Sequence, residues 1–238
     1  MEHVYGILKS LGVEDIQLGN LYIGGCSLDQ HCANLRGDLP NYEYRTNTKD
    51  VWENELAVKM SQGLTEREWD FVFTQQRSGY SGLPETYEYL DEVLAYIKTT
   101  AKGSPKFGWQ LTWSYAKDSN HEDFLRYDND QDKMYASILN AVQTKVVGKG
   151  LTIIPSGTAI QNGRLVFGDV LNRDGFHLSF ALGRYIAGLC VVKALVGLNI
   201  DNVTFAPDGV SDEERKLAIA VVNAACANPF EVTDVNKQ

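Results

Sequence analysis

The sequence predicts an α/β fold in which a parallel sheet carries helices on both faces. Short apolar runs typical of strands alternate with longer runs whose apolar residues recur every three or four positions, as in amphipathic helices. That alternation is typical of parallel sheets covered on both sides. The chain has 238 residues, of which 44 % are hydrophobic, and we find no internal repeat or linker. We therefore predict a single domain, 1–238.

Composition narrows the range of partners. The formal net charge of −9 argues against nucleic acid and anionic membranes, which attract basic proteins. No run of about 18 apolar residues predicts a membrane span, and the chain opens on a helical pattern rather than a signal peptide. Cys26 and Cys32 are close enough in sequence to form a disulfide, and the sequence does not decide whether they do. Cys190 and Cys226 lie in apolar helical runs and are predicted to be core residues. No metal-type Cys/His spacing is present.

The first part of the chain predicts a helix, a strand and a second helix. Apolar residues at helical spacing precede Gly12, and alternating apolar residues over 16–23 indicate a strand of the parallel sheet. Gly24, Gly25 and Ser27 follow it, before a helix over 28–35. Two interpretations stay open for the glycine pair: a ligand site at the carboxyl edge of the sheet, or a tight turn.

The middle of the chain places two amide side chains after a strand. Residues 37–55 predict an insertion or small hairpin, and 69–74 a strand that ends in Gln75 and Gln76. Amides at the carboxyl end of a strand can donate hydrogen bonds to an oxyanion, but exposed loop glutamines are the alternative.

The remaining chain continues the alternation. We predict helices over 84–99, 133–147, 178–196 and 211–227, strands over 107–113 and 151–155, a polar aromatic loop over 114–127 and a turn at 156–158. Arg164 follows that turn, and it is a candidate either for binding an acidic sugar or for an ion pair with Asp169. The carboxyl ends of strands 16–23, 69–74 and 151–155 are expected at one edge of the sheet.

Asp174 and His177 stand three residues apart in a loop before an apolar helix. A carboxylate at this spacing can fix the tautomer of the imidazole and leave the other ring nitrogen free to move a proton. The alternative is an Asp near a helix N-terminus and a surface His in the first turn.

Taken together, the motifs resemble those of the SGNH (GDSL-like) hydrolases, flavodoxin-like three-layer esterases and lipases, and more narrowly a bacterial branch of uncharacterised function. The segments that carry the resemblance are 19–28, 69–78, 108–115, 154–162 and 173–179. The resemblance implies Asp174 and His177 as orienter and base, and the Gly25 N–H as an oxyanion donor. Gln76 falls where the family has Gly-x-Asn and is the expected second donor, and Gln75 is a candidate for substrate binding.

The family's nucleophile block departs most from this sequence. The resemblance implies a Ser on a turn after a first strand, and both precede the helix with which this chain starts. We expect either a chain that is truncated relative to the family or a pseudoenzyme. Ser27 and Ser156, each of which follows a predicted strand, are the alternative nucleophiles within the sequence. A secreted or periplasmic location would follow from an upstream signal peptide and a cytoplasmic one from the chain as written, so localisation and oligomeric state stay open.

The resulting hypothesis is a serine esterase that removes O-acyl groups, such as acetyl, from a small molecule or glycan without metal or organic cofactor. The alternative is a catalytically inactive carbohydrate-binding or interaction protein on the same scaffold. The substrate class follows from the resemblance and from an aromatic-rich chain with twelve Tyr and four Trp.

Overall fold

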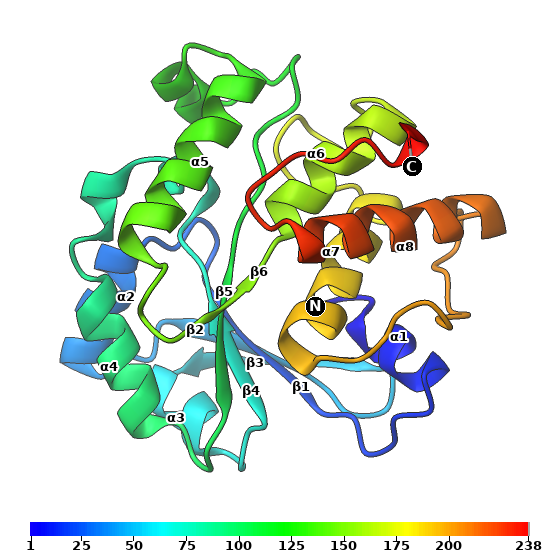
Figure 1. Ribbon diagram of the computed structural model, residues 1–238. Helices are drawn as coiled ribbons and strands as arrows, with labels where there is room; N and C mark the ends of the chain where they lie inside the picture. Colours follow the sequence, from blue (N-terminus) through cyan, green and yellow to red (C-terminus); the bar gives the residue numbers. More distant parts are fainter. Residues whose placement is uncertain (238) are drawn as a thin grey trace.

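The computed structural model describes residues 1–237 and contains two three-stranded sheets (Figure 1). The first sheet is parallel, in the order β4-β5-β6. The second is antiparallel, in the order β1-β2-β3. The strands are β1 (Leu18–Tyr22), β2 (Tyr42–Asn47), β3 (Trp52–Val58), β4 (Phe71–Thr74), β5 (Lys106–Gln110) and β6 (Thr152–Ile154).

Helices cover both faces of the parallel sheet, which confirms the predicted three-layer α/β class (Figure 1). Helices α2, α3, α4 and α5 pack on one face, and α1, α6, α7 and α8 on the other. The α-helices are α1 (Val4–Ser10), α2 (Leu28–Gly37), α3 (Met60–Thr65), α4 (Leu90–Thr100), α5 (Gln131–Lys145), α6 (Ser156–Phe167), α7 (Leu182–Cys190) and α8 (Asp212–Ala227). Short 3₁₀ turns at Ser78–Tyr80, Pro84–Tyr87, Glu122–Tyr127 and Val235–Lys237, and a π-helical turn at Val191–Val196, complete the chain.

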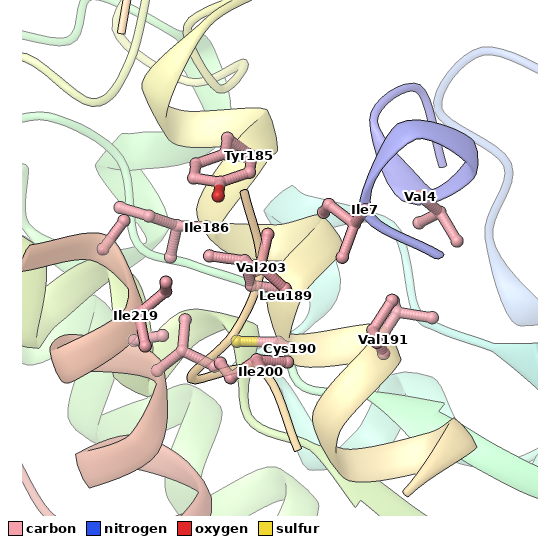
Figure 2. Packing of buried hydrophobic residues seen from close by; sticks show 14 of the residues in the cluster. Val4, Ile7, Tyr185, Ile186, Leu189, Cys190, Val191, Ile200, Val203 and Ile219 are labelled. Atoms are coloured by element: carbon pink, nitrogen blue, oxygen red, sulfur yellow. The ribbon is translucent and has the colours of Figure 1, made fainter. Parts of the chain in front are cut away.

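Two apolar clusters lie on the two faces of this sheet because successive strand residues point to opposite sides. Figure 2 shows the cluster under α1, α7 and α8, where Leu189 and Cys190 are fully buried. Cys190 is therefore a core residue, as predicted, while Cys226 is partly buried. Cys26 and Cys32 are both free thiols, so the disulfide left open above does not form.

The strand predicted over 16–23 does not belong to the parallel sheet. β1 pairs antiparallel with β2, and the hairpin expected within 37–55 forms as β2 and β3. The physical reason is that alternating apolar residues indicate a strand with one buried face but say nothing of the direction of its neighbour. The prediction was right about the element and wrong about its sheet.

The turn predicted at 156–158 is the start of α6. Two glycines lowered its helical signal, since Gly is a poor helix former. Burial explains their presence: a Cβ on Gly157 would lie 1.9 Å from the Thr112 carbonyl oxygen, so the helix reaches the end of β5 only with glycine there. The helix predicted over 178–196 begins four residues late, because Leu178 forms a β-bridge with Asn172. Among residues 1–237 no helix is long and apolar enough to cross a bilayer.

Candidate functional site

Asp174 and His177 form a hydrogen-bonded pair in the loop between α6 and α7. The distance from His177 Nδ1 to Asp174 Oδ2 is 2.8 Å, and the other carboxylate oxygen accepts the His177 backbone N–H at 2.8 Å. Both side chains are roughly half exposed, at 42 % and 49 %. The pairing predicted from their spacing is confirmed.

The loop is held in shape from both ends. Gly175 has a φ of +83°, which favours glycine, and its carbonyl accepts the Ala116 N–H at 2.8 Å. The indole N–H of Trp113 donates to the Phe176 carbonyl at 2.8 Å. The dyad is thus tied to the segment that follows β5, at the carboxyl end of the parallel sheet.

Electrostatics favour an ionised Asp174. Partial burial raises the pKa of its carboxyl, but hydrogen bonds from the His177 ring and from the His177 and Phe176 N–H groups lower it, and the pKa lies below its ordinary value. A carboxylate on Nδ1 directs the proton to that nitrogen and leaves Nε2 as the basic atom. Within residues 1–237, Nε2 has no hydrogen-bond partner.

An aromatic wall borders the dyad. The ring of Phe176 lies 3.9 Å from that of His177 and 4.4 Å from that of His121, between centroids. Tyr115 packs against both His121 and Phe176, and its hydroxyl lies 3.1 Å from Ser78 Oγ. Ser78 follows β4, so these contacts connect the dyad to the carboxyl end of that strand.

The turn after β1 meets the same edge. The Leu28 N–H donates to Gln76 Oε1 at 3.2 Å, which joins the segments that follow β1 and β4. Gly25 lies in the exposed turn with a φ of +64°, and its N–H has no partner among residues 1–237. Contacts therefore connect the segments that follow β1, β4 and β5, and the Gly25 N–H in the first of them remains a free donor.

Gln76 does not have the role predicted for it. Its side chain is fully buried, and its Oε1 accepts the N–H groups of Leu28 and Arg77. Its Nε2 donates to Thr86 O and Oγ1, at 3.0 and 3.1 Å. Because every polar atom is engaged, Gln76 is a structural brace rather than an oxyanion donor. Gln75 is partly exposed, and its amide makes no hydrogen bond within residues 1–237.

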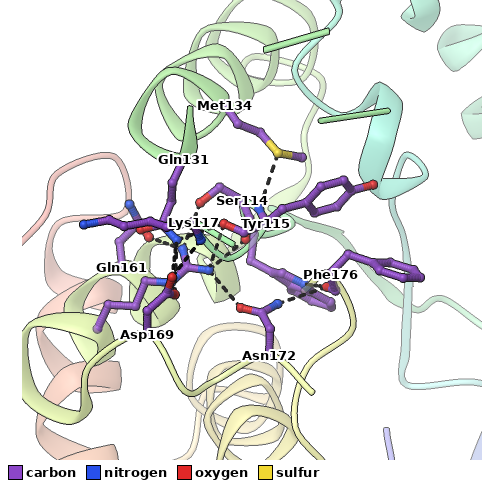
Figure 3. Close-up of polar contacts among 11 residues, drawn as sticks. Ser114, Tyr115, Lys117, Gln131, Met134, Gln161, Asp169, Asn172 and Phe176 are labelled. Carbon is purple, nitrogen blue, oxygen red and sulfur yellow. Dashed lines mark hydrogen bonds and ion pairs between the residues drawn. The ribbon is translucent and has the colours of Figure 1, made fainter. Parts of the chain in front are cut away.

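Arg164 is likewise structural, and the ion pair with Asp169 is the interpretation that the geometry supports. Its side chain is only 7 % exposed, and Nε lies 2.8 Å from Asp169 Oδ1. The guanidinium also donates to Ser114, Tyr115 and Asn172, a network drawn in Figure 3. Burial lowers the pKa of Arg164, and Asp169 opposes that shift. Arg164 thus locks the loop after β5 to the loop that carries the dyad, and no donor remains for a sugar.

The two alternative nucleophiles are poorly placed. Ser27 is 7 % exposed, and Ser156 is fully buried in the first turn of α6. Neither hydroxyl contacts His177. Two cavities lie away from the dyad: one of about 580 Å³ is lined by Thr152, Lys193 and Cys226 among others, at the opposite end of β6, and one of about 270 Å³ lies beside β3. Within residues 1–237 no three His, Cys, Asp or Glu side chains gather as a metal site requires.

Sequence reasoning missed the residues that surround the dyad. Tyr115 and Phe176 stood inside quoted motifs, yet nothing in the spacing showed that their rings meet. Arg173, Phe180 and Arg184 carried no signal, because nothing in their spacing showed that both guanidinium groups lie over the Phe180 ring.

Comparison with known proteins gives a family but no activity. Residues 2–226 match the family described as "Domain of unknown function (DUF4886)". A crystal structure of a DUF4886 family protein from Bacteroides uniformis superposes with a TM-score of 0.93 at 35 % sequence identity, covering 98 % of this chain and 92 % of the other. No curated protein matches. This chain belongs to the DUF4886 family.

Proposed function

We propose that this protein is a serine esterase of SGNH type that removes acyl groups, such as acetyl, from a carbohydrate. The observation that carries the proposal is the Asp174–His177 pair, with a carboxylate on Nδ1 and an unshared Nε2. An orienting carboxylate and a free ring nitrogen are what a general base for acyl transfer requires.

The mechanism follows from these positions. A serine oxygen attacks the ester carbonyl carbon while Nε2 of His177 takes its proton, and Asp174 stabilises the resulting imidazolium. The N–H of Gly25, joined by the amide of Gln75, donates to the oxyanion. Nε2 then gives that proton to the leaving alcohol, and the acyl group stays on the serine. In the second half, Nε2 takes a proton from water, the water attacks the acyl carbon, and the acid leaves as the serine oxygen recovers the proton.

Among residues 1–237, no serine hydroxyl is hydrogen-bonded to Nε2 of His177, so the nucleophile is missing from the site. The resemblance places it on a strand that precedes Met1. β4 supports this, since it pairs only with β5 among the described residues and leaves its other edge open to a further strand. Ser27 is the alternative within the sequence as written.

The test compares the chain as written with a version extended into its natural upstream coding sequence, on a chromogenic acetyl ester. We expect turnover only in the extended version, with a loss of several orders of magnitude on His177→Ala and an unchanged melting temperature. Equal turnover of both versions, abolished by Ser27→Ala, would place the nucleophile at Ser27. No turnover in either version, together with binding of a neutral oligosaccharide, would favour the inactive carbohydrate-binding protein instead.

A further inference from the structure

Two arginines hold one exposed phenylalanine beside the dyad. Phe180 is 57 % exposed, although large apolar side chains usually avoid water. The guanidinium carbons of Arg173 and Arg184 lie 4.3 and 4.5 Å from its ring centroid. Cation–π contacts at this distance fix flexible arginine side chains in place.

These arginines keep hydrogen-bond donors unused, in contrast to Arg164. Arg173 donates no side-chain hydrogen bond within residues 1–237, and its Nε lies 3.5 Å from Asp174 Oδ2, beyond good hydrogen-bond geometry. Arg184 donates to the carboxylate of Glu2 through Nη1 alone. Each guanidinium has five N–H groups, so most of them point to no protein acceptor.

The cluster adjoins the dyad through Asp174. Asp174 Oδ2, the oxygen nearest Arg173, is also the oxygen that accepts from His177. The backbone N–H of Arg173 donates to the backbone carbonyl of His177 at 2.9 Å. The Phe180 carbonyl is fixed by the His3 ring at 2.7 Å. The position of the cluster next to the dyad is therefore set by backbone contacts, not by side-chain rotamers alone.

We propose that Arg173, Phe180 and Arg184 form a subsite for an anionic group on a sugar, a carboxylate or a sulfate. The planar edge of a guanidinium donates two parallel N–H bonds that match two oxygens of such a group. Asp174 and Glu2 balance much of the positive charge, so recognition depends on these directed donors rather than on a general positive field. The subsite's place in substrate binding rests on the proposed esterase function, whereas its anion binding does not.

The test is calorimetric titration of the chain with digalacturonic acid, a lactose monosulfate and lactose. We expect at least one of the two acidic sugars to bind more tightly than lactose. The acidic sugar with the lower Kd shows whether the subsite prefers a carboxylate or a sulfate. Arg184→Gln should raise the Kd of that sugar by about tenfold or more, as loss of a hydrogen bond to a charged group predicts. Phe180→Ala should raise the same Kd because it removes the ring that holds both guanidinium groups in place. Arg184→Lys, which keeps the charge but loses the fork, should fall between.

Arg36→Gln is the matched control. Arg36 also pairs with a carboxylate, that of Glu92, and lies over a ring, that of Tyr89, but far along the fold from the dyad. Its substitution should leave every Kd unchanged. Equal binding of acidic sugars and lactose, or equal effects of Arg184→Gln and Arg36→Gln, would overturn the subsite. If the acidic sugar binds but neither the chain as written nor the upstream-extended version hydrolyses the acetyl ester, the subsite stands and the esterase proposal alone is removed.

Discussion

The Arg164–Asp169 ion pair and the Asp174–His177 dyad lie close together and both pair a carboxylate with a basic side chain, but they differ in burial and in free hydrogen-bonding atoms. Arg164 and Asp169 are mostly buried, and the guanidinium donates to five residues that hold two loops together. Asp174 and His177 sit on one of those loops, half exposed, with the basic nitrogen unshared. A side chain whose polar atoms are all hydrogen-bonded is therefore a structural brace, whereas one that keeps a polar atom free is a candidate for chemistry, whatever its residue type.

The two regions should differ most in what a substitution does to activity. Asp174→Asn should lower the ester turnover of the extended protein by about 10⁴-fold. The new amide can still accept the His177 N–H and keep the loop, but it offers a donor to Nδ1 and leaves the proton on Nε2, where a base is needed. Steady-state kinetics with a melting curve check this. Activity within tenfold of the unsubstituted protein would show that Asp174 is only a loop residue.

Arg164→Ala should act on stability instead. Removing one partner of a buried ion pair costs about 3–5 kcal/mol, because the other is left without its charge partner. Urea unfolding measures that loss, and Arg164→Lys should recover part of it. If Arg164→Ala leaves the unfolding free energy unchanged but weakens sugar binding, Arg164 is a substrate-binding residue and not a structural one.

The sequence could predict only part of this difference between the ion pair and the dyad. The local pattern predicted the strand–helix alternation and the Asp174–His177 pair, because both depend on residues close in the chain. It could not show that β1 joins the antiparallel hairpin, since strand direction depends on a distant partner. Nor could it show that every polar atom of the Gln76 and Arg164 side chains is engaged, since their hydrogen-bond partners lie up to 50 residues away.

The adjacent glutamines offer a sharper version of the comparison. Gln76→Ala leaves the N–H groups of Leu28 and Arg77 without their acceptor, so we expect a loss of about 2–3 kcal/mol of stability. Gln75→Ala should leave stability unchanged and lower kcat by about 10²-fold, as loss of an oxyanion donor does. Paired unfolding and kinetic measurements decide. Two variants with the same profile would mean that the free amide of Gln75 has no catalytic part.

The last and weakest effect concerns His31, a partly buried histidine with one side-chain hydrogen bond. His31 lies in α2, and its Nδ1 is 2.8 Å from the Tyr42 hydroxyl. Burial lowers the pKa of His31 to about 4, while Asp29 raises it slightly. The unfolded chain, with a His pKa of about 6.5, therefore binds the proton more readily, and stability falls as pH drops from about 6.5 towards 4. Between pH 7 and 5 the loss should be about 1–2 kcal/mol.

His31→Gln removes this titration and keeps a polar partner for Tyr42, so its urea-unfolding free energy should depend less on pH across that interval. Tyr42→Phe is the matched control, because it removes the hydrogen bond but keeps the buried imidazole and hence the slope. If His31→Gln and the unsubstituted protein lose stability equally between pH 7 and 5, the imidazole is already hydrated in the folded state. His31, despite its hydrogen bond to Tyr42 of β2, would then not belong with Arg164 and Gln76 among the buried structural side chains.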